Sequence, residues 1–298
     1  MVRLTGLSAF PITPADASGK VDTARVGTIV RRLTVAGVDS IGLLGSTGTY
    51  AYLTREERRR TTEAALAEAG TTPVLVGIGA LRTDEAIRLA EDAKAAGAAA
   101  GLLAPVSYTP LLDEEVFQHF RAVAATGLPL CIYDNPGTTH FTFSPMLIGK
   151  LSRLDGVVAV KTGAKPKDEV AAQLAALKAE VRDGFSVGSS VDLNAPEAML
   201  AGAAAWYSVI GGTLPKATLA ITRSAQAGDA AETRRLYAAL EPIWAVFRAH
   251  TSIRVVYAMS ELLGLGRAEP PLPILPLEGA ALAEVAAALE NLPIEMRG

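Results

Sequence analysis

Eight short, mostly continuous apolar runs are spaced along this chain, and segments with helical signals separate them. Continuous apolar runs of this length are typical of parallel strands that are buried on both faces. The pattern predicts strands at Leu7–Phe10, Ser40–Leu44, Val74–Ile78, Ala100–Ala104, Leu128–Tyr133, Val157–Lys161, Phe185–Gly188 and Ala204–Ile210.

The segments between these runs begin and end as helices do. Thr54 to Glu57 form a capping box in which Thr54 caps the helix and Glu57 reaches back to it. Gly37, Gly97 and Gly127 each end a helical segment just before the next apolar run. Strand, helix and turn, repeated in this way, predict an α/β fold of the (β/α)₈ TIM-barrel type. An open doubly wound sheet is the alternative, but no GxGxxG motif opens the first unit.

The chain continues beyond the eighth run with further helical segments. We expect the barrel to occupy residues 1–213 and residues 214–298 to form a C-terminal helical extension of the same structural unit. A proline-rich break at 269–273 precedes a last alanine-rich helix near 277–291. We expect these additional helices to pack outside the barrel or against another subunit.

Charge and composition exclude several classes of partner. The formal net charge is −3, which favours neither a nucleic acid nor an anionic membrane surface. Cys131 is the only cysteine, so no internal disulfide can form. The first residues lack the apolar core of a signal peptide, and charges and glycines interrupt the alanine-rich stretches. These features predict a cytoplasmic protein without a membrane span.

Lys161 stands directly after four apolar residues, at the end of the sixth run. Functional residues of barrel enzymes lie at the carboxyl ends of the strands. Burial disfavours the charged form of an amine, and a neutral amine can attack a carbonyl carbon to form a Schiff base. The alternative is a lysine whose stem lies along the barrel while its charged head reaches solvent.

Tyr133 ends the fifth run, next to the strand of Lys161. Adjacent parallel strands are about 4.8 Å apart, so the two ends can share one site. A phenol beside a Schiff-base lysine could relay protons. The alternative is a tyrosine at the edge of the core with a satisfied hydroxyl.

Ser46 and Thr47 follow the second run, and Gly45 and Gly48 flank them. Two adjacent hydroxyls and successive backbone N–H groups can bind a small carboxylate. The alternative is an ordinary turn between a strand and a helix. A phosphate-binding loop is disfavoured, because no Gly-Lys-Ser/Thr sequence follows.

Other side chains fit structural roles. His119, His140 and His250 lack metal-ligand spacing, so no metal site is expected. Cys131 lies inside an apolar run and is expected in the core. The run Arg58-Arg59-Arg60 lies on a glutamate-rich helix and predicts a solvated face.

Several of these segments together resemble the dihydrodipicolinate synthase / N-acetylneuraminate lyase family of pyruvate-dependent class I aldolases. The resemblance covers nearly the whole chain, and it rests on Phe10–Pro14, Gly45–Gly48, Pro105–Pro110, Tyr133–Pro136 and Val158–Lys161. It implies a barrel with C-terminal helices, usually assembled as a homotetramer, although a dimer is also open. It implies no metal or organic cofactor, since the iminium formed with the substrate serves as the electron sink.

The resemblance also implies roles for individual residues. Lys161 would form the Schiff base with pyruvate or another 2-keto acid, and Tyr133 would be the proton relay. Ser46 would be its hydroxyl partner, and Thr47 with its backbone would hold the keto acid's carboxylate. Gly188 and Tyr207 end the seventh and eighth runs, so they are expected to contact the second substrate. Gly45 and Gly48 belong to the same substrate-binding turn.

Three positions differ from the family pattern. Thr49 stands where the family usually has glutamate. Ser107 stands where lysine-biosynthetic members carry a tyrosine that reaches a neighbouring subunit, with Tyr108 beside it as a further substrate-binding candidate. Thr138 stands where those members carry an arginine that grips the second substrate's carboxylate, and threonine lacks the planar fork of a guanidinium. The keto-acid half of the site is therefore expected to be retained, and the acceptor half changed.

The sequence thus predicts a Schiff-base-forming lyase or aldolase that makes or cleaves a C–C bond between a 2-keto acid and an aldehyde. A keto-deoxy sugar acid is one substrate that fits. The alternatives are 4-hydroxy-tetrahydrodipicolinate synthase, which joins pyruvate to aspartate semialdehyde, and a keto-deoxy sugar acid dehydratase. A non-catalytic barrel that binds a keto acid as a sensor is the alternative from another class.

Overall fold

Eight parallel strands close into a barrel in chain order, with β1 paired to β8. The computed structural model describes residues 4–297. The strands are β1 (Gly6–Ala9), β2 (Ser40–Leu43), β3 (Val74–Gly77), β4 (Ala100–Leu103), β5 (Leu130–Tyr133), β6 (Val157–Gly163), β7 (Ser186–Ser190) and β8 (Ala205–Ser208). The (β/α)₈ barrel predicted from the apolar runs is confirmed.

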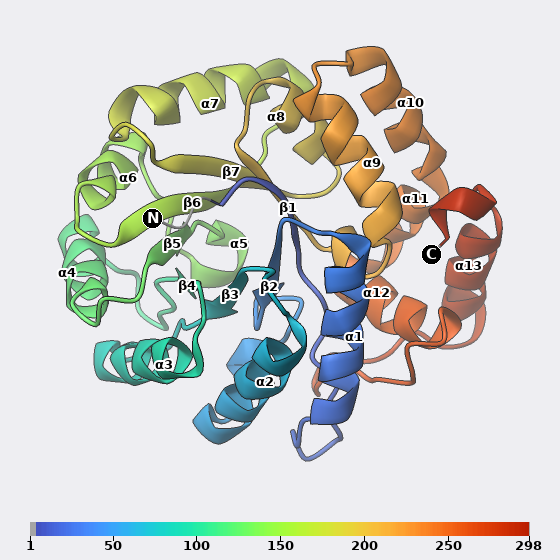
Figure 1. Cartoon of the computed structure of the whole chain (residues 1–298), viewed down its shortest axis with the longest axis horizontal. Coiled ribbons are helices and arrows are strands. Elements are labelled where there is room, and N and C mark those ends of the chain that lie inside the picture. The colour runs from blue at the N-terminus through green and yellow to red at the C-terminus, as the bar shows by residue number, and fades with distance from the viewer. Residues whose placement is uncertain (1–3, 298) are drawn as a thin grey trace.

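Helices surround the barrel, as Figure 1 shows. Those between the strands are α1 (Thr23–Ala36), α2 (Arg55–Glu68), α3 (Thr83–Ala96), α4 (Asp113–Ala124), α5 (Pro136–Thr139), α6 (Pro145–Ser152), α7 (Lys167–Glu180) and α8 (Ala195–Leu200). After β8 come α9 (Pro215–Gln226), α10 (Ala230–Ala239), α11 (Glu241–His250), α12 (Ser252–Leu262) and α13 (Gly279–Glu290). Short 3₁₀ turns are η1 (Tyr50–Tyr52), η2 (Ile210–Gly212) and η3 (Ile294–Met296). Helices α9 to α13 gather on one side of the barrel. Within residues 4–297 no helix has the length and apolar character needed to cross a membrane.

Several strand ends differ from the sequence prediction, and β6 runs to Gly163, two residues past the predicted end at Lys161. Strand β7 continues two residues past Gly188 to Ser190, because the barrel buries both added serines and Ser190 Oγ donates to the Thr162 carbonyl at 3.1 Å. Strand β8 ends at Ser208, before the predicted end at Ile210. The backbone N–H groups of Val209 and Ile210 instead donate to the Asp192 carboxylate. Polarity alone therefore misplaced these ends.

One of the two hydrogen bonds predicted for the capping box at α2 is present. Thr54 Oγ1 accepts from the Glu57 N–H at 3.2 Å, as an N-cap does. Glu57 does not return the bond, because its Oε2 accepts from the Val21 N–H at 2.8 Å, far away in the sequence. Gly37 and Gly97 adopt the left-handed conformation at the ends of α1 and α3, as predicted.

Two apolar clusters follow from the alternation of side chains along the strands. The smaller cluster fills the barrel interior and includes Phe10, Leu75, Cys131, Tyr133 and Tyr207. The larger cluster lies between the barrel and its helices. Because Cys131 and Tyr133 are two residues apart on β5, both point inward. This alternation directs the Tyr133 phenol to the centre of the barrel mouth.

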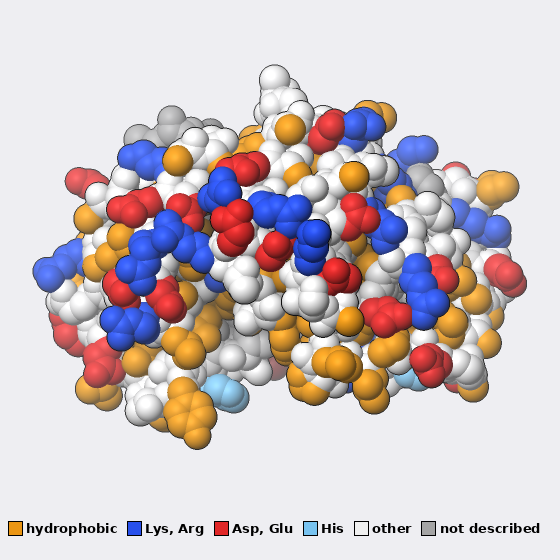
Figure 2. All heavy atoms as spheres, turned by 90° about the horizontal axis from the view of Figure 1, so that it is seen from below, with side chains coloured by type: hydrophobic (Ala, Val, Ile, Leu, Met, Phe, Trp, Pro, Cys, Tyr) orange, Lys and Arg blue, Asp and Glu red, His pale blue; other side chains and the backbone are white. Residues whose placement is uncertain are grey.

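The surface carries mixed charge. Figure 2 shows Lys and Arg side chains interspersed with Asp and Glu on the face seen from below. Many of these charges form exposed ion pairs, such as Arg55 with Asp92 and Arg234 with Glu197. Exposed pairs of this kind contribute little to stability, so the fold is held mainly by the two apolar clusters.

We expect Gly77→Ala to lower the free energy of unfolding by about 2–3 kcal/mol. A Cβ atom at Gly77 would lie 1.7 Å from the Leu44 carbonyl oxygen, so the backbone between β2 and the following turn must shift. Gly163→Ala is the matched control, since its Cβ would lie 3.6 Å from Val191 Cγ2. Urea unfolding of both variants measures the difference, and equal stability would contradict the steric argument.

Candidate active site

A cavity of about 430 Å³ lies at the carboxyl ends of the strands. Residues after β2, at the ends of β5, β6 and β7, after β8 and on the C-terminal helices line it together. They are Phe10, Ser46, Thr47, Tyr133, Asn135, Thr138, Lys161, Ser190, Val191, Asp192, Leu193, Tyr207, Val209, Phe247, Ser252 and Ile253. The volume is within the range of small-molecule sites.

Lys161 and Tyr133 lie side by side at the mouth of the barrel. They are register partners on β6 and β5, and Lys161 Nζ lies 4.0 Å from the centre of the Tyr133 ring. The same Nζ lies 5.4 Å from the centre of the Phe10 ring. Lys161 is only 7% exposed and Tyr133 5%. The amine is therefore buried at the cavity, and its head does not reach bulk solvent.

The Tyr133 hydroxyl has two side-chain partners. Ser46 Oγ lies 3.0 Å from it, and Asn135 Nδ2 donates to it at 2.9 Å. Burial acts to raise the pKa of Tyr133, but the charge of Lys161 and the two hydrogen bonds outweigh it, so the pKa lies below its ordinary value. A phenol with a lowered pKa, hydrogen-bonded and beside an amine, is equipped to give and take a proton.

The turn that holds Ser46 and Thr47 is tightly packed. Leu44 before it and Thr49 after it both have positive φ, which is uncommon for residues other than glycine. A Cβ at Gly45 would lie 2.7 Å from the Phe10 ring, and one at Gly48 would lie 2.9 Å from the Leu44 backbone. The two glycines do not line the cavity, but their lack of a side chain lets the turn close against Phe10 and against itself.

This geometry agrees with what comparison with known proteins finds. The family model described as the dihydrodipicolinate synthetase family matches residues 3–292. The chain belongs to that family. A 4-hydroxy-tetrahydrodipicolinate synthase of Alcanivorax borkumensis is 34% identical over 91% of each chain. A crystal structure named as dihydrodipicolinate synthase of Agrobacterium tumefaciens has 51% identity and a TM-score of 0.95, with 98% of this chain and 99% of that chain covered. A structure from Pseudomonas aeruginosa described as a putative dihydrodipicolinate synthetase has 30% identity and a TM-score of 0.89, with 97% and 100% covered.

Membership places the protein among the lyases of the class I aldolase type, which act through a lysine Schiff base. The sequence prediction of this enzyme class is confirmed. The roles assigned to single residues of the family site remain predictions.

Tyr207 and Gly188 were expected to contact the second substrate, and of these two Tyr207 lines the cavity. Tyr207 lines the cavity from the barrel interior, and Cys131 Sγ lies 3.7 Å from its hydroxyl. Burial raises the pKa of the Tyr207 hydroxyl well above its usual value. Gly188 does not line the cavity, because β7 continues beyond it. A Cβ there would lie 2.4 Å from Tyr207 Cε2, so Gly188 makes room for the Tyr207 ring.

The segment that differs from lysine-biosynthetic family members points outward. Tyr108 is 98% exposed and does not line the cavity of its own chain. Ser107 Oγ donates to the Thr109 carbonyl within the same loop. Thr138, in contrast, does line the cavity, on the short helix α5. The structure therefore brings one of the three differing positions into the site.

Sequence reasoning missed several lining residues of this family site. Asn135 lay within the segment Tyr133–Pro136 that carries the family resemblance, and its position two residues after Tyr133 was a signal that it shares a side with the phenol. No local sequence pattern pointed to Asp192, because its hydrogen-bond partners Trp206 and Ile210 belong to β8 and the turn after it. Burial raises the pKa of the Asp192 carboxyl. Phe247 and Ile253 arrive from α11 and α12, which no local pattern connects to the barrel mouth.

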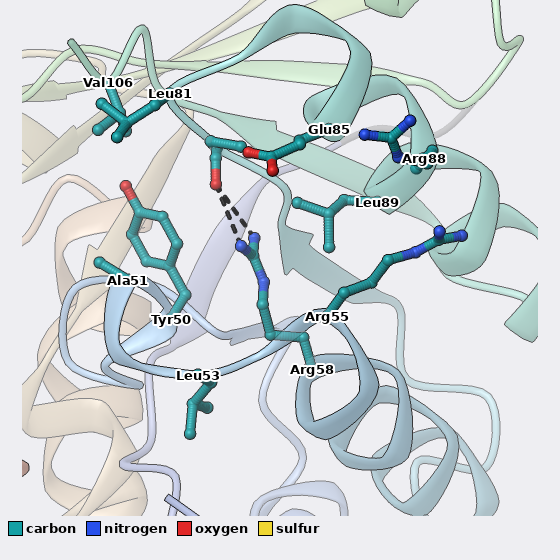
Figure 3. A pocket seen from close by; sticks show the side chains of 12 residues that line it. Tyr50, Ala51, Leu53, Arg55, Arg58, Leu81, Glu85, Arg88, Leu89 and Val106 are labelled. Atoms are coloured by element: carbon teal, nitrogen blue, oxygen red, sulfur yellow. Dashed lines mark hydrogen bonds between the residues drawn. The ribbon is translucent and has the colours of Figure 1, made fainter.

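A second cavity, of about 550 Å³, lies beside η1, α2 and α3 and is drawn in Figure 3. The prediction of a solvated arginine run is wrong for Arg58, which is 7% exposed and points to the loop after β3. Its guanidinium donates to the carbonyls of Gly77 and Gly79, and burial lowers its pKa to about 10. Arg59 is exposed and Arg60 is half-buried, and both pair with glutamates of the same helix. Arg58 thus ties α2 to the end of β3.

The described part of the chain contains no group of three or more His, Cys, Asp or Glu side chains placed to hold a metal ion. His119 illustrates why. Its Nδ1 is hydrogen-bonded to Thr83 Oγ1 at 3.0 Å, and burial lowers its pKa to about 4. Cys131 is likewise buried, and burial raises its thiol pKa to about 12, which fits a core residue and not a nucleophile.

Proposed function

We propose that Lys161 Nζ attacks the keto carbon of pyruvate or a related 2-keto acid and forms the Schiff base on which the reaction runs. Attack gives a carbinolamine, which loses water to leave an iminium. Loss of a proton from the adjacent carbon gives an enamine, whose carbon adds to the aldehyde carbon and forms the new C–C bond, while the aldehyde oxygen takes up a proton and becomes a hydroxyl. Water then releases the product and restores the amine, and the reverse sequence cleaves the bond. The observation that carries the proposal is the buried Lys161 amine 4.0 Å from the Tyr133 ring.

Tyr133 and Ser46 would move the protons in this scheme. The Tyr133 phenol protonates the carbinolamine hydroxyl as it leaves as water, and the phenolate then accepts a proton from the adjacent carbon. Ser46 Oγ, 3.0 Å from the phenol oxygen, passes protons between Tyr133 and the cavity. Thr47 and the backbone N–H groups of its turn hold the keto acid's carboxylate. The iminium withdraws electrons, so this route uses no metal or organic cofactor.

The proposal includes a cytoplasmic homo-oligomer, a dimer or a tetramer. Tyr108 is almost fully exposed on its own chain, and an exposed phenol on a loop near a barrel mouth is suited to a subunit contact. The second candidate reaction is that of 4-hydroxy-tetrahydrodipicolinate synthase, the name carried by the Alcanivorax borkumensis relative. Thr138 counts against it, because a threonine cannot grip a carboxylate as an arginine does.

Borohydride trapping tests the proposal directly. The protein is incubated with pyruvate and then with borohydride, which delivers hydride to the imine carbon and makes the linkage permanent. Intact-mass and peptide analysis should locate one reduced adduct on Lys161. An adduct on no residue, with pyruvate and with other small 2-keto acids, would refute the Schiff base and favour the sensor alternative.

We expect Asn135→Ala to move the alkaline limb of the kcat/KM–pH profile upward by about 0.5–1 unit. The Asn135 amide donates to the Tyr133 oxygen and helps to lower its pKa, so its loss raises that pKa. Since the proposed reaction needs the protonated phenol, activity then persists to higher pH. Asn194→Ala is the control, because the Asn194 amide donates to the Ala164 carbonyl. An unmoved limb would show that Asn135 does not act through Tyr133.

A further inference from the structure

The residues that line the cavity fall into two chemically different groups, which we call its inner and outer halves. The inner half holds Lys161, Tyr133, Ser46 and Thr47, which the proposed function assigns to the keto acid. The outer half is supplied by the segments after β7 and β8 and by α11 and α12. Its apolar residues are Val191, Leu193, Val209, Phe247 and Ile253. These side chains come from the loop after β7, the loop after β8 and the helices α11 and α12, and they make up the apolar part of the lining, which we call the apolar wall.

The lining offers this second substrate no free charge. Besides Lys161, the lining residue that carries a charged group is Asp192. Its Oδ1 accepts from Trp206 Nε1 at 2.9 Å, and its Oδ2 accepts from the Ile210 N–H at 2.8 Å. Both oxygens are therefore already bonded within the protein. A carboxylate on the second substrate would lose its water at this wall and find no cation to replace it.

Two hydroxyls of the lining already donate within the protein. Thr138 Oγ1 donates to the Asn135 carbonyl at 3.2 Å, and Ser190 Oγ donates to the Thr162 carbonyl at 3.1 Å. A substrate hydroxyl could donate to these two oxygens, but it would receive no hydrogen bond from them unless an existing bond broke. Polar groups that are buried without a hydrogen-bond partner destabilise the complex.

We propose that the second substrate of this chain is an aldehyde whose carbon chain is apolar, aliphatic or aromatic, and not a charged semialdehyde or a sugar. This inference rests on the proposed Schiff-base function. The keto acid occupies the inner half, and the aldehyde carbonyl meets the enamine there. The apolar part of the aldehyde then packs on Val191, Leu193 and Phe247 and removes both surfaces from water.

Three aldehydes of one chain length test this with the full-length protein and pyruvate: butanal, succinic semialdehyde and erythrose. We expect the kcat/KM for butanal to exceed those for the other two by at least about a hundredfold. Leu193→Gln should reduce the butanal value about tenfold, while Leu193→Met, which keeps an apolar side chain of similar volume, should stay within about twofold. Borohydride trapping of pyruvate should be unchanged in both variants.

The outcomes separate the two proposals. Trapping on Lys161 together with equal or better use of succinic semialdehyde or erythrose overturns the apolar aldehyde and leaves the Schiff base standing. Trapping with turnover of none of the three aldehydes overturns it as well. Failure to trap any keto acid overturns the proposed function itself.

Discussion

Lys161→Ala is expected to abolish the pyruvate adduct and to reduce aldol turnover by about 10⁴-fold or more, since the variant loses the nucleophile and keeps only substrate positioning. The Lys161 side chain lines the cavity, and its Nζ lies near the rings of Tyr133 and Phe10. Trapping followed by mass analysis, with a keto-acid turnover assay at saturating aldehyde, measures both effects.

Lys165→Ala provides the matched control for this experiment. Lys165 lies four residues further along the chain, is exposed, and pairs with Glu169 on α7. Its removal should leave both the adduct and the turnover unchanged. Thermal unfolding of both variants shows whether the barrel remains folded. A folded Lys161→Ala variant with full activity would refute the role given to this residue.

Tyr133→Phe is expected to reduce kcat by about 10²–10⁴-fold while pyruvate binding is largely kept. The substitution preserves the ring beneath Lys161 Nζ and removes only the hydroxyl that Ser46 and Asn135 contact. Carbinolamine dehydration then lacks its proton donor, so the adduct should form slowly. The rate at which the adduct appears in timed borohydride quenches measures this step separately from later ones.

Tyr257→Phe controls for the loss of a buried phenol. The Tyr257 hydroxyl lies 3.4 Å from Thr49 Oγ1, and the residue does not line the cavity. This variant should keep the wild-type rate of adduct formation. If Tyr133→Phe matched it, proton transfer would have to be assigned to another group, and Ser46 would be the first to examine.

Local patterns predicted much of the fold and the inner half of the site. The apolar runs identified all eight strands, because a strand buried on both faces is mostly apolar. Lys161 and Tyr133 stood out as polar residues at the ends of such runs. The closed barrel then makes them register partners on neighbouring strands. The glycines around Ser46 predicted a tight turn, because such a turn tolerates few other residues.

The outer half of the site depends on contacts between segments that are distant in the sequence. Phe247 and Ile253 line the cavity because α11 and α12 pack next to the barrel mouth. The sequence periodicity of those helices does not indicate this packing. Arg58 looked like its exposed neighbours until the packing of α2 on the loop after β3 buried it. Strand β7 ran past Gly188 because the barrel interior accepts serines whose hydroxyls find partners there.

The residues along the chain thus specified a (β/α)₈ lyase of the dihydrodipicolinate synthetase family and predicted its reactive amine, since strand burial and turn chemistry are local constraints. The character of the space for the second substrate emerged from the folded chain alone. Whether a lining carboxylate such as Asp192 is free or already bonded depends on donors from other units, and this is a property of three-dimensional packing.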